Sequence, residues 1–77
     1  MKNQFLLVIV LESYDRNGLM FRGHGSMSPT NMYININDIS VVYPDAHDQF
    51  RSWIYLNNGV NLYVDGRYDA IITSANF

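Results

Sequence analysis

Hydroxyl side chains close to a histidine are the residues of this chain best suited to covalent chemistry. Three of them follow His24 in one glycine-rich segment, namely Ser26, Ser28 and Thr30. A nucleophilic hydroxyl needs an adjacent general base and a third group that orients the base. The segment contains no Gly-x-Ser-x-Gly turn, and Gly23-His-Gly25 is too short to be a phosphate-binding fingerprint. We therefore predict that the protein is not an enzyme.

Metal chemistry is the next alternative, because Asp45 and Asp48 flank His47. The chain has two histidines and no cysteine, at spacings that match no familiar ligand pattern. The remaining aspartates are scattered through segments that read as turns, where Asp is favoured for local hydrogen bonding. We predict no metal site, no pair of catalytic carboxylates and no cofactor.

A candidate ligand site lies near the C-terminus, where Arg67 follows Gly66 at the start of an expected helix. The free amides and positive dipole at a helix start attract phosphate or carboxylate, and arginine adds a two-pronged donor. Tyr68, or Tyr55 of a neighbouring subunit, would supply a ring on which a base can stack. The site would suit a nucleotide. The alternatives are an arginine in solvent and a strand over residues 68–73, which would remove the amide cluster.

An aromatic face is expected on the hairpin formed by residues 51–64. It consists of Arg51, Trp53, Tyr55 and Tyr63. Exposed aromatic rings with an arginine are typical of protein interfaces and of base-stacking surfaces. Large aromatic residues are also commonly buried, so a second core layer beneath the N-terminal hairpin is an alternative. We predict an interface here, with the core layer and a ligand-stacking platform left open.

Length and composition favour self-association. The 77 residues make a single domain, residues 1–77, with 48% hydrophobic and 16% charged residues. A chain of this size buries only roughly 60% of its unfolded surface on folding. No disulfide can stabilise it further, because there is no cysteine. Because the chain is both small and rich in apolar residues, we expect it to bury part of its surface against another subunit.

Charge and hydropathy narrow the partners. The net charge is −2 with only five basic residues, whereas nucleic-acid binding usually needs a basic patch, so a nucleic-acid partner is disfavoured. The apolar run 5–11 is far shorter than the ~20 residues of a membrane-spanning helix. Glu12 follows it directly and no signal-peptide cleavage site appears. We expect a cytoplasmic protein with no membrane partner.

The elements that must position these residues are mostly strands. Residues 5–11 are apolar at every position, as in a strand covered on both faces, and a partner chain would supply the second cover. A turn over residues 14–18 and a returning strand over 19–22 complete a hairpin. Further strands are expected over 32–36, 39–43, 51–56 and 60–64, and then a short helix. The predicted fold is mainly β, a small α+β protein with an antiparallel sheet or partly open barrel of five to six strands and one C-terminal helix.

The register of the last hairpin follows from Asn57-Asn58-Gly59. A three-residue loop with Gly59 in the left-handed conformation places Ile54 opposite Leu62, which keeps the apolar side chains on one face. A two-residue turn would mix the faces. We therefore predict a positive φ at Gly59.

Residues 32–72 resemble the small bacterial flagellar and swarming-motility protein family. The resemblance is carried by Tyr33-Ile34-Asn35 with Ile39, by the run from Ile54 to Gly59, and by Val64 before the expected helix. It implies a motility-associated regulatory role. The same rhythm is similar to the C-terminal half of LytTR-type DNA-binding domains, but those carry basic loop residues that this chain lacks.

The size and composition are also those of small phage proteins that sequester or block host immune components. We therefore expect a non-enzymatic, homo-oligomeric binding or inhibitor protein of bacterial or phage origin with an anti-defence role. Its target would be a host protein or a small anionic, nucleotide-type signal. The alternatives are a motility-associated regulator and a LytTR-like DNA-binding module.

Overall fold

A computed structural model describes residues 4–22 and 29–75. Its elements run along the chain as β1 (Phe5–Tyr14), β2 (Met20–Arg22), β3 (Thr30–Asn35), the 3-10 helix η1 (Ile36–Asp38), β4 (Ile39–Pro44), β5 (Arg51–Leu56), β6 (Asn61–Asp65) and α1 (Tyr68–Ala75). The prediction of a mainly β protein with one short C-terminal helix is confirmed. No helix in the described ranges is long and apolar enough to cross a membrane.

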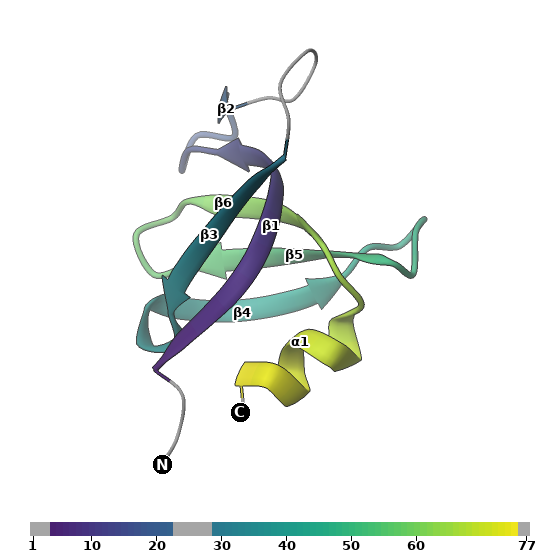
Figure 1. Ribbon diagram of the computed structural model, residues 1–77. Coiled ribbons are helices and arrows are strands. Elements are labelled where there is room, and N and C mark those ends of the chain that lie inside the picture. The colour runs from purple at the N-terminus through teal and green to yellow at the C-terminus, as the bar shows by residue number, and fades with distance from the viewer. Residues whose placement is uncertain (1–3, 23–28, 76–77) are drawn as a thin grey trace.

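The strands form one antiparallel sheet in the order β2-β1-β6-β5-β4, with β3 also paired to β1. β6 pairs with β1 over residues 9–14, while β3 pairs over residues 5–10 and β2 over 13–14. β3 and β2 therefore follow one another along the same side of β1, and the open sheet is five strands across. Figure 1 shows β1 and β3 passing obliquely over β4, β5 and β6, with α1 below them.

The core lies between these two parts of the curled sheet. Its buried apolar side chains are Leu6, Val8, Val10, Ile34, Val42, Ile54, Leu62, Val64, Ile71 and Ala75. In β1 the even-numbered residues point inward as far as Val10, and a bulge at Leu11 then shifts the phase so that Ser13 points inward. The continuous apolar run is thus an alternating strand with a bulge, and its odd-numbered residues face outward.

The hairpin of β5 and β6 has the predicted register. Ile54 lies opposite Leu62, and the Leu56 amide donates a hydrogen bond to the Val60 carbonyl (2.8 Å). Gly59 has φ +92°, which confirms the expected left-handed conformation. A Cβ at this position would lie 2.8 Å from the Cβ of Arg16, so the turn also requires the space that glycine leaves.

Two hydrogen bonds set the direction of the chain where β6 ends and α1 begins. The buried Ser52 hydroxyl donates to the Gly66 carbonyl (2.8 Å), and the Gly66 amide donates to the Phe50 carbonyl (2.8 Å). The helix then buries Ile71 and Ala75 against the sheet. The helix prediction for this segment is confirmed over the alternative strand.

Candidate functional site

The outer face of β1 and β3 carries four exposed apolar side chains, here called the β1–β3 strip: Phe5, Leu7, Ile9 and Tyr33. Their exposed fractions are 56%, 52%, 39% and 72% respectively. Leu7 lies directly opposite Tyr33 in the strand ladder, so the four are neighbours on one surface. Single exposed apolar residues are common, whereas a contiguous group is typical of an interaction site.

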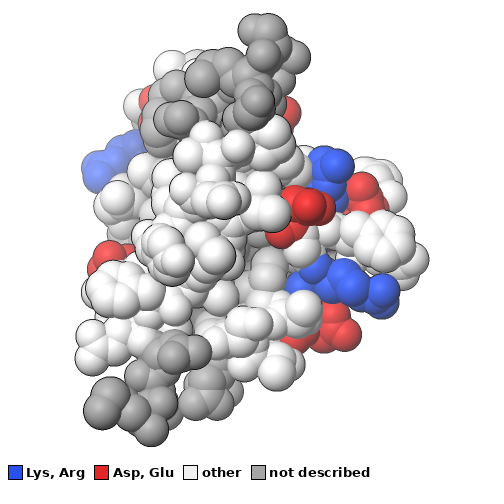
Figure 2. Space-filling model, viewed as in Figure 1, with Lys and Arg blue, Asp and Glu red and all other residues white. Residues whose placement is uncertain are grey.

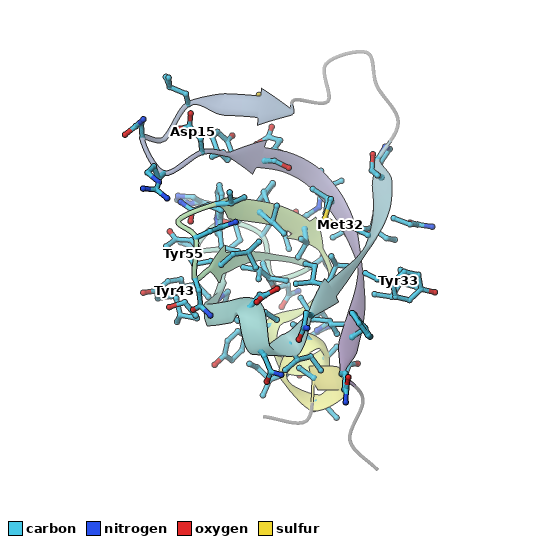
Figure 3. All side chains as sticks on the ribbon, turned by 90° about the vertical axis from the view of Figure 1, so that its left-hand side faces the viewer. Asp15, Met32, Tyr33, Tyr43 and Tyr55 are labelled. Atoms are coloured by element: carbon cyan, nitrogen blue, oxygen red, sulfur yellow. The ribbon has the colours of Figure 1, made fainter. Side chains whose placement is uncertain are left out.

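The alternation of β1 and β3 explains why the strip is exposed. Met32 and Ile34 turn inward to the core, which sends Tyr33 outward between them. Figure 3 shows Tyr33 projecting away from the molecule, on the side opposite to Tyr43 and Tyr55. In Figure 2 the surface over β1 and β3 is free of coloured charges, and the acidic and basic side chains lie toward its margins.

A second outer surface, over β5 and β6, carries an aromatic cluster formed by Tyr14, Trp53 and Tyr63 with Arg51. The ring centroids of Trp53 and Tyr63 are 4.7 Å apart, and those of Tyr14 and Trp53 are 5.7 Å apart. The Arg51 guanidinium lies 5.9 Å from the centre of the Tyr63 ring. All four cluster residues are half-buried.

The two tyrosine hydroxyls of the cluster donate hydrogen bonds within the chain. The Tyr63 hydroxyl donates to Asp45 Oδ2 (2.5 Å), which raises the pKa of Tyr63 and lowers that of Asp45. The Tyr14 hydroxyl donates to Glu12 Oε1 (2.5 Å). This hydrogen bond, with burial as a smaller cause, raises the pKa of Tyr14 to about 12. Both phenols are therefore neutral hydrogen-bond donors at physiological pH.

Charged contacts hold the edge of the cluster. Arg51 Nε lies 3.5 Å from an Asp65 carboxylate oxygen and 3.8 Å from one of Asp48. The structure therefore brings together Arg51, Trp53 and Tyr63, as predicted, with Tyr14 as a member that the sequence analysis did not identify. The group lies on the outer face of the sheet, which argues against a second core layer.

Tyr55, the remaining residue of the predicted aromatic interface, packs elsewhere. Its ring lies edge-on against Tyr43 with centroids 5.1 Å apart, and Figure 3 shows the two side by side. Tyr43 is 47% exposed. Within one chain Tyr55 thus belongs to a tyrosine pair, and its predicted role in a ligand site needs a neighbouring subunit.

At the predicted ligand site, Gly66, Arg67 and Tyr68 adjoin at the start of α1. The Arg67 guanidinium lies 5.5 Å from the centre of the Phe50 ring, and its Nε lies 3.8 Å from Asp69 Oδ1. That carboxylate also accepts a hydrogen bond from the Ala70 amide (3.0 Å). A negative charge therefore already stands at the helix start, where it competes with any anionic ligand.

The rest of that region is mostly apolar. Tyr68 and Ile72 line a hollow of about 230 Å³ together with residues 39–42 of β4. A hollow of this size is smaller than the ~300–1,000 Å³ typical of small-molecule pockets. The anion site stays a prediction.

The residues that were weighed for covalent or metal chemistry, and for which no such chemistry was predicted, lie only partly within the described residues. His24, Ser26 and Ser28 lie outside the described residues, while Thr30 begins β3. Asp45 accepts a hydrogen bond from the His47 amide (3.3 Å), and Asp48 accepts one from the Phe50 amide (2.9 Å). Both aspartates thus form local turns. Within residues 4–22 and 29–75, no three His, Asp or Glu side chains gather as a metal site would require.

Tyr33 is the functional candidate that the sequence analysis missed. The signal for it was the alternation from Asn31 to Asn35, in which Met32 and Ile34 share one face and leave Tyr33 on the other. The whole chain has no significant match among protein-family models, curated proteins or solved structures. The resemblance of residues 32–72 to motility proteins therefore stays a prediction.

Proposed function

We propose that the protein is a non-enzymatic binding protein that works as a homo-oligomer, and that a second copy covers the β1–β3 strip. The observation that carries this proposal is the exposure of Phe5, Leu7, Ile9 and Tyr33 on one charge-free surface. The chain is short and its core small, so contact between subunits supplies stability that one copy lacks.

Area arithmetic supports a contact of this kind. At roughly 150–250 Å² per aromatic side chain, Phe5 and Tyr33 together leave about 250 Å² in water. Covering that area in two copies is worth about 12 kcal/mol at ~25 cal/mol per Å². Association costs an estimated ~4–15 kcal/mol in lost freedom. The two rings thus come close to offsetting the cost, and Leu7 and Ile9 add the surplus.

A second copy is the favoured occupant because the strip carries no charge. A two-fold axis sets each residue near the axis against its own equivalent, so any charge there would face a like charge. Two sheets stacked face to face lie about 10 Å apart, which leaves room for the side chains of both strips.

The assembled protein would sequester or block another cytoplasmic molecule, either a host protein or a nucleotide-type signal. DNA binding is less favoured, because the guanidinium groups described here have partners within the chain. Arg16 donates to the Asn58 carbonyl (3.1 Å), while Arg51 and Arg67 each lie within 4 Å of a carboxylate.

A matched pair of substitutions tests the proposal. Leu7→Asp sets a charge in the strip, and Leu19→Asp sets the same charge on a leucine that is somewhat more exposed, 64% against 52%, between β1 and β2. Neither carboxylate is buried in a single chain, so both variants should keep the β-type circular dichroism of the wild type. Sedimentation velocity should show fewer subunits for Leu7→Asp and the wild-type number for Leu19→Asp. Equal subunit numbers in all three proteins would contradict the proposal.

A further inference from the structure

The sheet has two long outer edges, and the structure treats them differently. Among the described strands, β3 pairs only with β1, and β4 pairs only with β5. An unpaired strand edge offers a row of amides and carbonyls to any other strand, so natural proteins protect such edges. The protection of these two edges can be compared residue by residue.

Three residues of β3 direct their backbone groups to the free side. The Ile36 amide donates to the Gln4 carbonyl (2.9 Å), and these residues continue the register in which Leu6 faces Ile34. In an antiparallel ladder, bonded pairs alternate with pairs whose amides and carbonyls point away from each other. Residues 30, 32 and 34 therefore bond to β1, whereas residues 31, 33 and 35 present their amides and carbonyls outward.

The β4 edge carries several forms of protection. A bulge between Ile39 and Val41 interrupts the strand, and α1 lies beside it, with Tyr68 and Ile72 lining a hollow against residues 39–42. Pro44 occupies an outward-facing position by the same alternation, because the Asp45 amide bonds to the Arg51 carbonyl (3.1 Å). Proline offers no amide to an incoming strand.

The β3 edge carries none of these forms of protection over residues 30–35. Its sequence, Thr-Asn-Met-Tyr-Ile-Asn, contains no charge and no proline, and its pairing with β1 is regular from end to end. An uncharged, regular edge of this length is a strong template for strand addition.

We propose that β3 pairs with β3 of a second copy, antiparallel and centred on Tyr33, so that two sheets become one. The sequence suits this register because it is self-complementary. Tyr33 faces its own equivalent, Asn31 of one copy faces Asn35 of the other, and Met32 faces Ile34 of the other copy. Amides thus meet amides and apolar side chains meet apolar ones, with no like charges across the two-fold axis.

This inference rests on the proposed self-association but adds a separate contact. The strip is covered face to face, whereas the β3 edges meet side by side. Edge pairing also brings the two strips into one surface of twice the width. The Leu7→Asp protein, which has lost the face contact, should therefore remain a dimer of twice 8.9 kDa.

Asn35 offers a closely matched test of the edge. Its φ of −66° already suits proline, and its amide faces away from β1. Its side chain accepts a hydrogen bond from the Asn37 amide (2.9 Å), which Asn35→Pro and Asn35→Ala both remove. The two variants then differ in the outward amide and in the proline ring that replaces it. In the Leu7→Asp background, sedimentation equilibrium should show a monomer with Asn35→Pro and a dimer with Asn35→Ala.

Amide hydrogen exchange measured by NMR supplies a second readout on the unaltered edge. In the Leu7→Asp dimer, the amides of Asn31, Tyr33 and Asn35 should exchange at least tenfold more slowly than after dilution to monomer. Three fast amides, a monomeric Leu7→Asp protein, or a dimer that survives Asn35→Pro would each overturn edge pairing between copies. In those cases an oligomeric wild type would leave the proposed function standing. A monomeric wild type with fast amides would overturn both proposals and leave the β3 edge free for a strand of a different protein.

Discussion

The aromatic cluster and the β1–β3 strip lie on the same outer side of one sheet. They differ in how much of their side-chain surface is packed against, or hydrogen-bonded to, other residues of the chain. In the cluster, Trp53 is packed between two tyrosines whose hydroxyls donate to Asp45 and Glu12. In the strip, Tyr33 is 72% exposed and no ring of the described residues stacks on it. A density of aromatic residues therefore does not by itself mark an interface, and the deciding property is whether the rings are already covered.

The largest expected effect comes from truncating one aromatic side chain in each region. Trp53→Ala should lower the free energy of unfolding by about 3 kcal/mol, the lower end of the range for aromatic truncations, and leave the subunit number unchanged. Tyr33→Ala should do the reverse, with a stability change within about 0.5 kcal/mol in the dissociated protein and fewer subunits. Denaturant unfolding at fixed protein concentration and sedimentation measure the two properties. Loss of subunits in Trp53→Ala with its stability intact would move the interface to the cluster.

A smaller effect tests how closely the β1–β2 turn packs against the β5–β6 turn next to the aromatic cluster, where Arg16 donates a hydrogen bond to the Asn58 carbonyl. Gly59→Val should cost about 2–3 kcal/mol, because the backbone strain adds to a Cβ only 2.8 Å from the Arg16 side chain. Gly18→Val is the control, since Gly18 also has a positive φ of +83° but nothing within 4 Å of an added Cβ. It should cost about 1–2 kcal/mol, from strain alone. If thermal or denaturant unfolding shows that both variants lose the same free energy of unfolding, the Arg16 side chain moves aside at no measurable cost.

The smallest expected effect concerns pH and the cluster alone. The hydrogen bond to Glu12 raises the pKa of Tyr14 from 10.0 to about 12 in the folded chain. Because this pKa is higher in the folded chain than in the unfolded chain, the protonated Tyr14 stabilises the folded state. This contribution is complete below pH 10, the pKa in the unfolded chain, and is lost as pH rises from about 10 to about 12. Tyr14→Phe should therefore weaken the alkaline fall in unfolding free energy relative to wild type. Parallel pH profiles for the two proteins would show that the bond does not form in solution.

Much of the fold could be predicted because its signals are local. Pro44 ends a strand, Gly59 sets a hairpin register, and Gly66 precedes a helix, and each of these features acts over a few residues. The bulge at Leu11 could not be read from residues 5–11, since it depends on how β1 meets β6, more than fifty residues away. That bulge and the alternation before it turn an apolar run into a strand with one face exposed.

The candidate site was predicted in part for the same reason. Alternation along β5 and β6 correctly grouped Arg51, Trp53 and Tyr63 on one face. Whether that face was covered depended on Tyr14 from β1 and Asp45 from the loop after β4, which no local pattern reveals. The exposure of Tyr33 likewise depends on what covers the outer face of β3, which the alternation along β3 does not reveal.

Sedimentation equilibrium of the wild-type protein at micromolar concentration tests the central claim most directly, because every contact proposed here joins copies of one chain. The account predicts a folded species whose mass is a multiple of 8.9 kDa and exceeds that of the Leu7→Asp protein under the same conditions. A folded monomer of 8.9 kDa would contradict this account, because the β1–β3 strip would then be exposed to solvent and not covered by a second copy.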